Sequence, residues 1–293
     1  PLAYPDRQSD YGQLHGVPGL IYDSLPDSWG FRLMHRRMRA RGIDPQRATT
    51  LDRLAYLSDC TMGALTYSPA MADEQDSRDL TLLELAQEVE AVLTDEGHEV
   101  LAELARAGGS AGGARPKANV YFNPATGLMS TQEGRVPGAD AWLVKFPGTD
   151  DAADCCALEQ LYALMAGACD LGMMDTRHFQ LANGRTAFAT ARFDRRGHRR
   201  VHVHSLAGLL HANFQVPSVG YEDFFRVTRR LTRDQRQLVK ALQRCVFNVL
   251  MNNRDDHAKN LSFVMQADGG WQLAPPYDLT YCPGYQGEHF MEV

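Results

Sequence analysis

The segment Asn253 to Asn260, with the sequence NRDDHAKN, places carboxylate, amide and basic side chains directly after an apolar stretch. Asp255 and Asn260 are five residues apart, which is the spacing between the aspartate that deprotonates an attacking hydroxyl and the asparagine that binds magnesium in phosphoryl-transfer loops. A solvated polar cap at the end of a helix is the plain alternative. If the loop transfers phosphate, a second magnesium ligand and a cation for the phosphates should accompany it.

The second candidate magnesium ligand is Asp278. Two short apolar runs, 261–265 and 271–273, lie between it and Asn260, and the turn sequence at 268–270 joins them. This pattern predicts a β-hairpin. Because a hairpin returns the chain to its starting point, we expect Asp278 to lie beside Asn260. Such an oxygen pair suits magnesium, which binds a few carboxylates together with water and phosphate oxygens.

Two further residues of the loop leave alternatives open. Asp256 has the poorer spacing to Asn260 and is the weaker candidate for the base. His257 could form a metal site with Asp255 and Asp256, but zinc and iron sites need additional His or Cys ligands, and none is adjacent in the sequence. We therefore favour the phosphoryl-transfer interpretation of the loop.

Lys145 is the candidate cation, because it interrupts the apolar run from Trp142 to Phe146, which predicts a strand. Glu159 follows on a segment with a helical pattern. A strand lysine paired with a helix glutamate positions the nucleotide phosphates in protein kinases. A strand lysine that simply points to solvent is the alternative.

The glycine-rich stretch at 108–117 precedes this strand and could present backbone N–H groups to phosphates. It lacks the spacing of a P-loop, because Pro116 stands where a glycine is needed and Ala118 stands at the hydroxyl position. A P-loop ATPase is therefore disfavoured. Ser205 and His204 could be combined with several aspartates on paper, but no serine lies in a GxSxG sequence.

The elements expected around these residues change in type along the chain. Residues 1–25 are expected to be irregular, and Thr81 with Glu84 predicts a capping box that begins a helix. Strands are expected at 119–122, 141–146, 178–182 and 186–191, the last two around the turn Asn183-Gly184, in one antiparallel sheet. Helices are expected at 29–41, 98–107, 153–171, 205–214, 221–231 and 233–251, the last capped by Thr232 with Gln235.

Composition sets the broad class. The chain has 293 residues, of which 44% are hydrophobic and 23% charged, with a net charge of -6. These values indicate a globular protein of one large or two medium domains whose main partner is not nucleic acid. The six cysteines form no CxxC pair, and no signal peptide or long apolar stretch is evident, so a cytoplasmic location is expected. Because the chain runs from Pro1 to Val293 without a start methionine, we expect a fragment truncated at both ends.

Six segments resemble the HipA family of bacterial serine/threonine kinases, the toxins of toxin–antitoxin pairs. They occur in family order over about residues 105 to 280 and are SAGGARPKA (110–118), LVKFPG (143–148), RFDR (192–195), HSLAGLL (204–210), NVLMNNRDDHAKNLSF (248–263) and LAPPYDL (273–279). The resemblance implies the α+β fold class: a two-lobed, protein-kinase-like fold. We expect a mixed α/β N-terminal lobe with the antiparallel sheet over 1–190 and a mainly α-helical, incomplete catalytic lobe over 191–293.

The resemblance also implies a role for each candidate residue. Asp255 is the catalytic base, Asn260 and Asp278 bind Mg²⁺, Glu159 forms the structural ion pair, and Ser110 is the autophosphorylated serine whose modification switches the kinase off. ATP contacts are assigned to Lys145, Gly112, Gly113, Ala114, Phe193, Asp194, His257 and Lys259, with Phe193 and Asp194 at a connector that borders adenine and ribose.

The chain departs from the family pattern in three places. Many relatives carry Glu before the RFDR motif, where this chain has Ala191, so an adenine contact through that side chain is absent. The family's N-terminal barrel-like subdomain is expected to be missing, and the C-terminal helices are expected to stop short.

These observations predict an ATP- and magnesium-dependent serine/threonine protein kinase that would stall translation. The resemblance implies an aminoacyl-tRNA synthetase as the protein substrate, a helix-turn-helix antitoxin as partner, DNA contact only through the antitoxin complex, and no membrane contact. Two alternatives stay open. The acceptor could be a small molecule, or the chain could be a non-catalytic kinase-fold subunit that binds an antitoxin and DNA.

Overall fold

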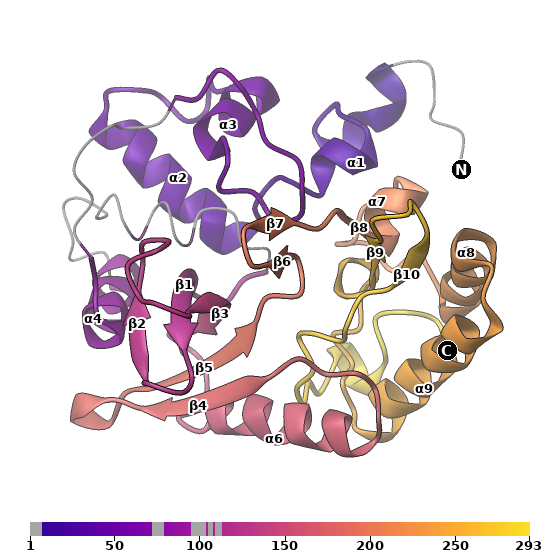
Figure 1. The fold of residues 1–293 in the computed structure, drawn as a ribbon. Coiled ribbons are helices and arrows are strands. Elements are labelled where there is room, and N and C mark those ends of the chain that lie inside the picture. The colour runs from indigo at the N-terminus through magenta and orange to yellow at the C-terminus, as the bar shows by residue number, and fades with distance from the viewer. Residues whose placement is uncertain (1–7, 72–78, 95–103, 105–107, 109–112) are drawn as a thin grey trace. The chain divides into compact units, whose positions relative to one another are not determined.

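The computed structural model describes residues 8–71, 79–94, 104, 108 and 113–293 (Figure 1). The chain divides into two compact units. The sheet unit comprises residues 24–157 and 175–199, and the helical unit comprises residues 1–23, 158–174 and 200–293. The chain passes from one unit to the other after residues 23, 157, 174 and 199. The domain boundary expected between residues 190 and 191 stays a prediction.

The sheet unit contains one five-stranded antiparallel sheet (Figure 1). Its order is β2-β1-β3-β5-β4, with β1 at Lys117–Asn123, β2 at Leu128–Ser130, β3 at Asp140–Lys145, β4 at Thr176–Gln180 and β5 at Thr186–Ala191. The predicted antiparallel sheet is confirmed. Strand β2 was not predicted, because three residues are too few for an alternating pattern to emerge. The turn between β4 and β5 is a short 3-10 helix, η2, at Ala182–Gly184.

Helices pack on this sheet through a common apolar core. Helix α2, at Ser28–Ala40, and helix α4, at Leu82–Leu93, contribute Leu33, Leu85 and Val89, which pack with Val120 and Val144 of the strands. The predicted capping box of α4 is present, because Glu84 N–H donates to Thr81 Oγ1 at 3.2 Å and Thr81 N–H donates to Glu84 Oε2 at 2.8 Å. The helix predicted at 98–107 lies outside the described residues, apart from Leu104.

One prediction about the N-terminal part is corrected, and one helix was not predicted. Residues 1–25 are not wholly irregular, because the 3-10 helix η1 spans Gln8–Leu14 and α1 spans Gly19–Tyr22. A further helix, α3 at Thr50–Leu57, begins with a capping box of Thr49 and Asp52 and was not predicted. Helix α6 at Cys155–Ala168 is confirmed and crosses from the sheet unit into the helical unit.

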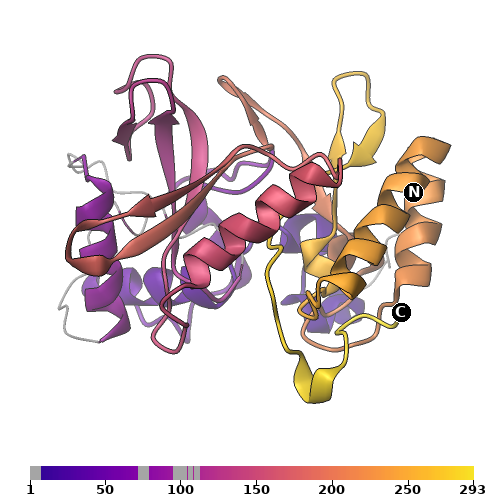
Figure 2. The same ribbon diagram turned by 90° about the horizontal axis from the view of Figure 1, so that it is seen from below.

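The helical unit is built on α7 at Leu206–Leu210, α8 at Tyr221–Thr232 and α9 at Gln235–Leu250. Figures 1 and 2 both show α8 and α9, in orange tones, side by side, and Phe224, Ala241 and Phe263 lie in their shared core. Helix α7 ends earlier than predicted, because His211 adopts the left-handed conformation at φ 54°.

The cap of α9 is also different from the prediction. Thr232 is the last residue of α8, and its hydroxyl donates to the Thr228 carbonyl at 2.8 Å. Asp234 caps α9 instead, because its carboxylate accepts the N–H of Arg236 at 2.9 Å. Both residue types suit a helix start, so local sequence could not choose between them.

A small antiparallel sheet with the order β10-β9-β8 completes the helical unit. Strands β9, at Ser262–Met265, and β10, at Trp271–Leu273, form the predicted hairpin, which is confirmed. Strand β8, at Val203–Ser205, pairs with β9 as an unpredicted third strand. Two short strands, β6 at Arg195–Arg196 and β7 at Arg199–Arg200, pair separately. Two further 3-10 helices, η3 at Ala258–Asn260 and η4 at Tyr285–Gly287, flank the hairpin.

The N-terminal segment is tied to the helical unit through Asp23. Its carboxylate accepts a hydrogen bond from His204 Nδ1 at 2.5 Å, from Ser205 N–H at 2.7 Å and from Ser205 Oγ at 2.6 Å. Helices α1 and α7 approach backbone to backbone, since a Cβ on Gly19 would lie 1.9 Å from the Gly208 carbonyl oxygen. Ser205 and His204 therefore anchor this contact in the described structure.

This anchor predicts an acid-sensitive contribution to stability. Burial alone would raise the pKa of the Asp23 carboxyl, but the hydrogen bonds and charge of His204 and the bonds of Ser205 outweigh it and lower that pKa. The contribution is complete above the unfolded carboxyl value of about 4 and is lost as pH falls below it toward the folded pKa. Asp23→Asn should lower the free energy of unfolding at pH 7 by about 2 kcal/mol.

Urea unfolding of wild type and Asp23→Asn between pH 3 and pH 7, the range set by ordinary carboxyl titration, checks this prediction. The difference between the two proteins should shrink as the pH falls below about 4. A difference that stays constant over this range would mean that the ionised Asp23 carboxylate does not contribute.

Candidate active site

The polar loop after α9 is braced at its first residue. Asn253 is 2% exposed, and its Nδ2 donates to Asn248 Oδ1, on the last turns of α9, at 3.0 Å. The backbone next to it pairs with a distant segment, because Cys282 N–H donates to the Asn252 carbonyl at 3.0 Å. The loop is therefore a fixed continuation of α9 and not a frayed helix end.

Asn260 folds back onto the loop. It ends η3, and its Nδ2 donates to the backbone carbonyl of Asp255 at 2.9 Å. The Asp255 residue is exposed. The single hydrogen bond brings the two predicted residues together and orients the other end of the amide, Oδ1, as an oxygen that could bind a cation.

The hairpin returns the chain to this loop as predicted. Ala274 N–H donates to the Ser262 carbonyl at 2.9 Å, and the Tyr277 hydroxyl donates to the Lys259 carbonyl at 2.7 Å. The residue before Asp278 is thus bonded to the residue before Asn260. Burial raises the pKa of Tyr277, which keeps this hydroxyl protonated as a donor.

Asp278 itself has a left-handed backbone with φ 57°. This conformation is unusual for a residue other than glycine, although aspartate tolerates it better than most. Such backbone conformations often occur at functional sites, where the surrounding structure maintains them. The backbone of Asp278 is therefore one more feature that fits a ligand position.

Asp256 belongs to the core and differs in this from its neighbour Asp255. It is 1% exposed, and its carboxylate accepts hydrogen bonds from the Tyr221 hydroxyl at 2.8 Å, His289 Nδ1 at 2.9 Å, Phe290 N–H at 3.0 Å and Met291 N–H at 3.3 Å. Each of the two carboxylate oxygens thus accepts two hydrogen bonds. Because these bonds tie the loop to the surrounding core, this carboxylate braces the loop. Burial, with the Asp256 charge next, raises the pKa of Tyr221.

His257 and Lys259 lie among aromatic rings. The His257 ring is 5.1 Å from the Phe214 ring and 5.9 Å from the Phe290 ring, between centroids. The Lys259 ammonium lies 4.8 Å from the centroid of Phe214 and 5.3 Å from that of Tyr22, within the range of cation–π attraction. The ATP contacts assigned to these two side chains stay predictions.

In the sheet unit, Lys145 ends β3 and is only 5% exposed. It lies opposite Lys117 of β1 and Phe188 of β5. The alternative that Lys145 simply points to solvent is therefore wrong. Glu159, in the helical unit, is 3% exposed, so both members of the predicted ion pair are buried, and the pair itself stays a prediction.

Part of the glycine-rich stretch is described. The Gly113 N–H donates to the carboxylate of Asp27, next to the start of α2, at 2.6 Å, and Ala114 is exposed. Ser110 and Gly112 lie outside the described residues. The phosphate contacts of this stretch and the modification of Ser110 therefore stay predictions.

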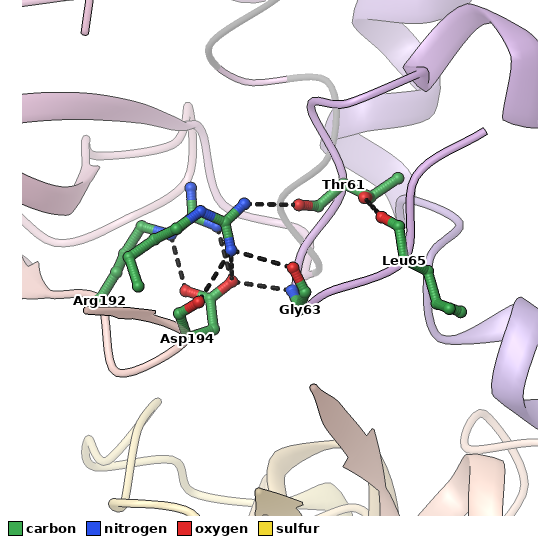
Figure 3. A network of polar contacts seen from close by, with 6 residues as sticks. Thr61, Gly63, Leu65, Arg192 and Asp194 are labelled. Atoms are coloured by element: carbon green, nitrogen blue, oxygen red, sulfur yellow. Dashed lines mark hydrogen bonds and ion pairs between the residues drawn. The ribbon is translucent and has the colours of Figure 1, made fainter. Parts of the chain in front are cut away.

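The connector after β5 carries Phe193 and Asp194. Phe193 is half-buried, whereas Asp194 is 1% exposed and forms a two-bond ion pair with Arg192, with Nε to Oδ1 at 2.9 Å and Nη2 to Oδ2 at 2.7 Å (Figure 3). Burial alone would raise the pKa of Asp194, but Arg192 and then Arg195 hold it below its ordinary value. The ATP contacts assigned to Phe193 and Asp194 stay predictions.

Comparison with known proteins identifies the class. The antiparallel sheet, the helical unit and the braced loop define a kinase-like fold. The chain belongs to the HipA family: the model of the HipA-like C-terminal domain matches residues 109–293, and the model of the HipA N-terminal domain matches residues 2–68. The second match corrects the expectation that the family's N-terminal part is missing.

Individual relatives are distant. A putative kinase of Sinorhizobium fredii strain NGR234, Y4mE, is 27% identical over 175 residues, covering 55% of this chain and 38% of that protein, so the chain spans well under half of this curated relative. The HipA structure from a Shewanella oneidensis HipA, HipB and operator DNA complex has a TM-score of 0.68 at 20% identity, covering 97% of this chain and 68% of that chain. The Helicobacter pylori kinase CtkA has a TM-score of 0.40 at 16% identity, covering 57% and 54%.

Among the described residues, no helix combines the length and the apolar character that a membrane-spanning helix requires.

Proposed function

We propose that this chain is an ATP- and magnesium-dependent serine/threonine protein kinase of the HipA type. The observation that carries the proposal is the bonded loop: Asn260 is attached to Asp255, and Tyr277 attaches the residue before Asp278 to Lys259. Three oxygen-bearing side chains with the spacing of a phosphoryl-transfer loop are thereby supplied by one rigid substructure.

Each residue has a definite task in this proposal. The exposed Asp255 carboxylate orients the acceptor hydroxyl and takes its proton. Asn260 Oδ1 and the Asp278 carboxylate would hold Mg²⁺, whose charge, when bound, neutralises the phosphate oxygens. The buried Lys145 ammonium is assigned to the phosphates of ATP, and the backbone at Phe193 to the adenine.

The acceptor and partners follow from family membership. We propose an aminoacyl-tRNA synthetase as substrate, autophosphorylation at Ser110 as the off switch, and a cytoplasmic location. The Shewanella HipA in the structural comparison is complexed with HipB and operator DNA. By analogy we propose a helix-turn-helix antitoxin as partner, with DNA contacted through that antitoxin.

Nucleotide use and acceptor class can be tested separately. The melting temperature should rise with ATP and Mg²⁺ and return to its starting value when EDTA is added, whereas a non-catalytic subunit should show no shift. Incubation with a bacterial lysate and γ-labelled ATP should then label protein bands on a gel. Label found only in the small-molecule fraction would replace the protein acceptor by a small one.

A further inference from the structure

A loop of the N-terminal domain is bonded to Asp194, in the connector between β5 and β6, and to Arg195, the first residue of β6. Arg195 donates from Nη2 to the Thr61 carbonyl at 2.9 Å and from Nη1 to the Gly63 carbonyl at 3.0 Å. The Gly63 N–H donates to Asp194 Oδ2 at 2.8 Å (Figure 3). We call the set Thr61, Gly63, Arg192, Asp194 and Arg195 the connector clamp. Its bonds join main-chain groups on one side to side chains on the other.

The loop side of the clamp has a defined shape. Thr61 is fully buried, and its hydroxyl donates to the Leu65 carbonyl, while Tyr67 N–H donates to the Ser58 carbonyl at 3.0 Å. Gly63 has φ 71°, in the left-handed region that favours glycine. The loop is therefore a closed turn whose tip offers one N–H and two carbonyls to the connector.

The connector side consists of three charged side chains that are largely shielded from solvent. Asp194 Oδ2 receives Arg192 and Arg195 at 2.7 Å each, in addition to Gly63. The side chains of Arg192, Asp194 and Arg195 are 7%, 1% and 14% exposed. A buried ionic network with its partners satisfied fixes one geometry, and removing a member leaves the others unpaired.

The two sides of the clamp belong to different parts of the family. Thr61 and Gly63 lie within residues 2–68, matched by the N-terminal domain, and the three charged residues lie within 109–293, matched by the C-terminal domain. All five lie in the sheet unit. The clamp is thus a direct polar contact between the two family domains, made at the residues that flank Phe193.

We infer that Asp194 and Arg195 are positioning residues through which the N-terminal domain controls nucleotide affinity. By holding the loop at 61–65, they fix the backbone of Phe193, to which the proposed function assigns the adenine. Asp194 then acts through the connector and not as a ligand of the ribose. This inference rests on the proposed function.

The experiment measures loop opening and nucleotide affinity in the full chain. Arg195→Ala removes both loop carbonyl contacts, Arg195→Lys keeps the charge but loses the planar fork, and Gly63→Ala strains the turn from the opposite side. Arg196→Ala is the matched control, because Arg196 is the exposed next residue. Hydrogen exchange of peptides containing Gly63 reports opening, and calorimetric titration with a non-hydrolysable ATP analogue and Mg²⁺ reports affinity.

We expect Arg195→Ala and Gly63→Ala to speed exchange at Gly63 and to raise the Kd and the KM for ATP about tenfold, the factor that one charge-assisted hydrogen bond corresponds to. The value of kcat at saturating ATP should stay within about twofold, since the variants affect binding and not the transfer step. Arg195→Lys should give an intermediate Kd, and Arg196→Ala should match wild type.

The outcomes separate the inference from the proposed function. If wild type binds the analogue, and the Arg195→Ala and Gly63→Ala variants show faster exchange at Gly63 but an unchanged Kd, the inference alone is overturned. A wild type that does not bind the analogue would overturn both. If Arg195→Ala does not fold, Gly63→Ala and Arg195→Lys give the same decision, because each perturbs one side of the clamp.

Discussion

Asp255→Asn is expected to lower the rate of phosphoryl transfer about a thousandfold, the usual size of a lost general-base contribution. The residue is exposed, and Asn260 bonds to its backbone carbonyl, which the substitution leaves in place. The melting temperature and the Kd for ATP should therefore stay close to wild type. The rate of ADP formation with a saturating protein acceptor measures the effect.

A matched control for this variant is Asp170→Asn. Asp170 is an exposed aspartate of the helical unit outside the loop, and its φ of 54° is one that asparagine also adopts readily. Its replacement changes the net charge by the same amount and should leave the rate unchanged. If Asp255→Asn were as active as Asp170→Asn, the base would have to be sought elsewhere.

Asp256→Asn, in contrast to Asp255→Asn, should strongly lower the free energy of unfolding. The buried carboxylate accepts hydrogen bonds from four donors. In asparagine, an NH2 group replaces one of the two oxygens, so some of these donors would face hydrogens and lose their acceptor. Removing one partner of a buried charged network lowers the free energy of unfolding by about 3 to 5 kcal/mol, and we expect a loss of about 3 kcal/mol here. Urea unfolding monitored by circular dichroism measures it.

Tyr221→Phe serves as the graded control for Asp256. It removes only the hydroxyl that bonds to Asp256 and to Asn248, so we expect a loss of about 1 kcal/mol. Stability losses that are equal in the two variants would show that Tyr221 alone carries the effect. No stability loss in Asp256→Asn would contradict its bracing role.

Much of the arrangement of the loop could be predicted because its signals are local. The spacing of Asp255 and Asn260, and the hairpin that returns the chain to Asp278, depend on a short continuous segment. Spacing preferred Asp255 to Asp256, and the burial of Asp256 gives that choice a physical reason. The capping box at Thr81 was predictable for the same reason.

The bracing contacts could not be predicted, because their partners are remote. The donors to Asp256 lie 33 to 35 residues away, and Gly63 lies 131 residues from Asp194. Nothing in the RFDR sequence distinguishes a buried ionic network from a ligand contact. The N-terminal segment was missed because α1 has four residues, too few for a helical period to appear.

We propose that the chain moves the γ-phosphate of ATP onto protein hydroxyls. Phosphopeptide mass spectrometry of the wild-type chain, incubated with ATP, Mg²⁺ and a bacterial lysate, tests it most directly, with Asp255→Asn run in parallel. We expect phosphoserine or phosphothreonine in wild-type samples, including phosphate on Ser110, and none above background with the variant. Phosphopeptides equal in both samples, or absent from a wild type that binds ATP, would contradict it.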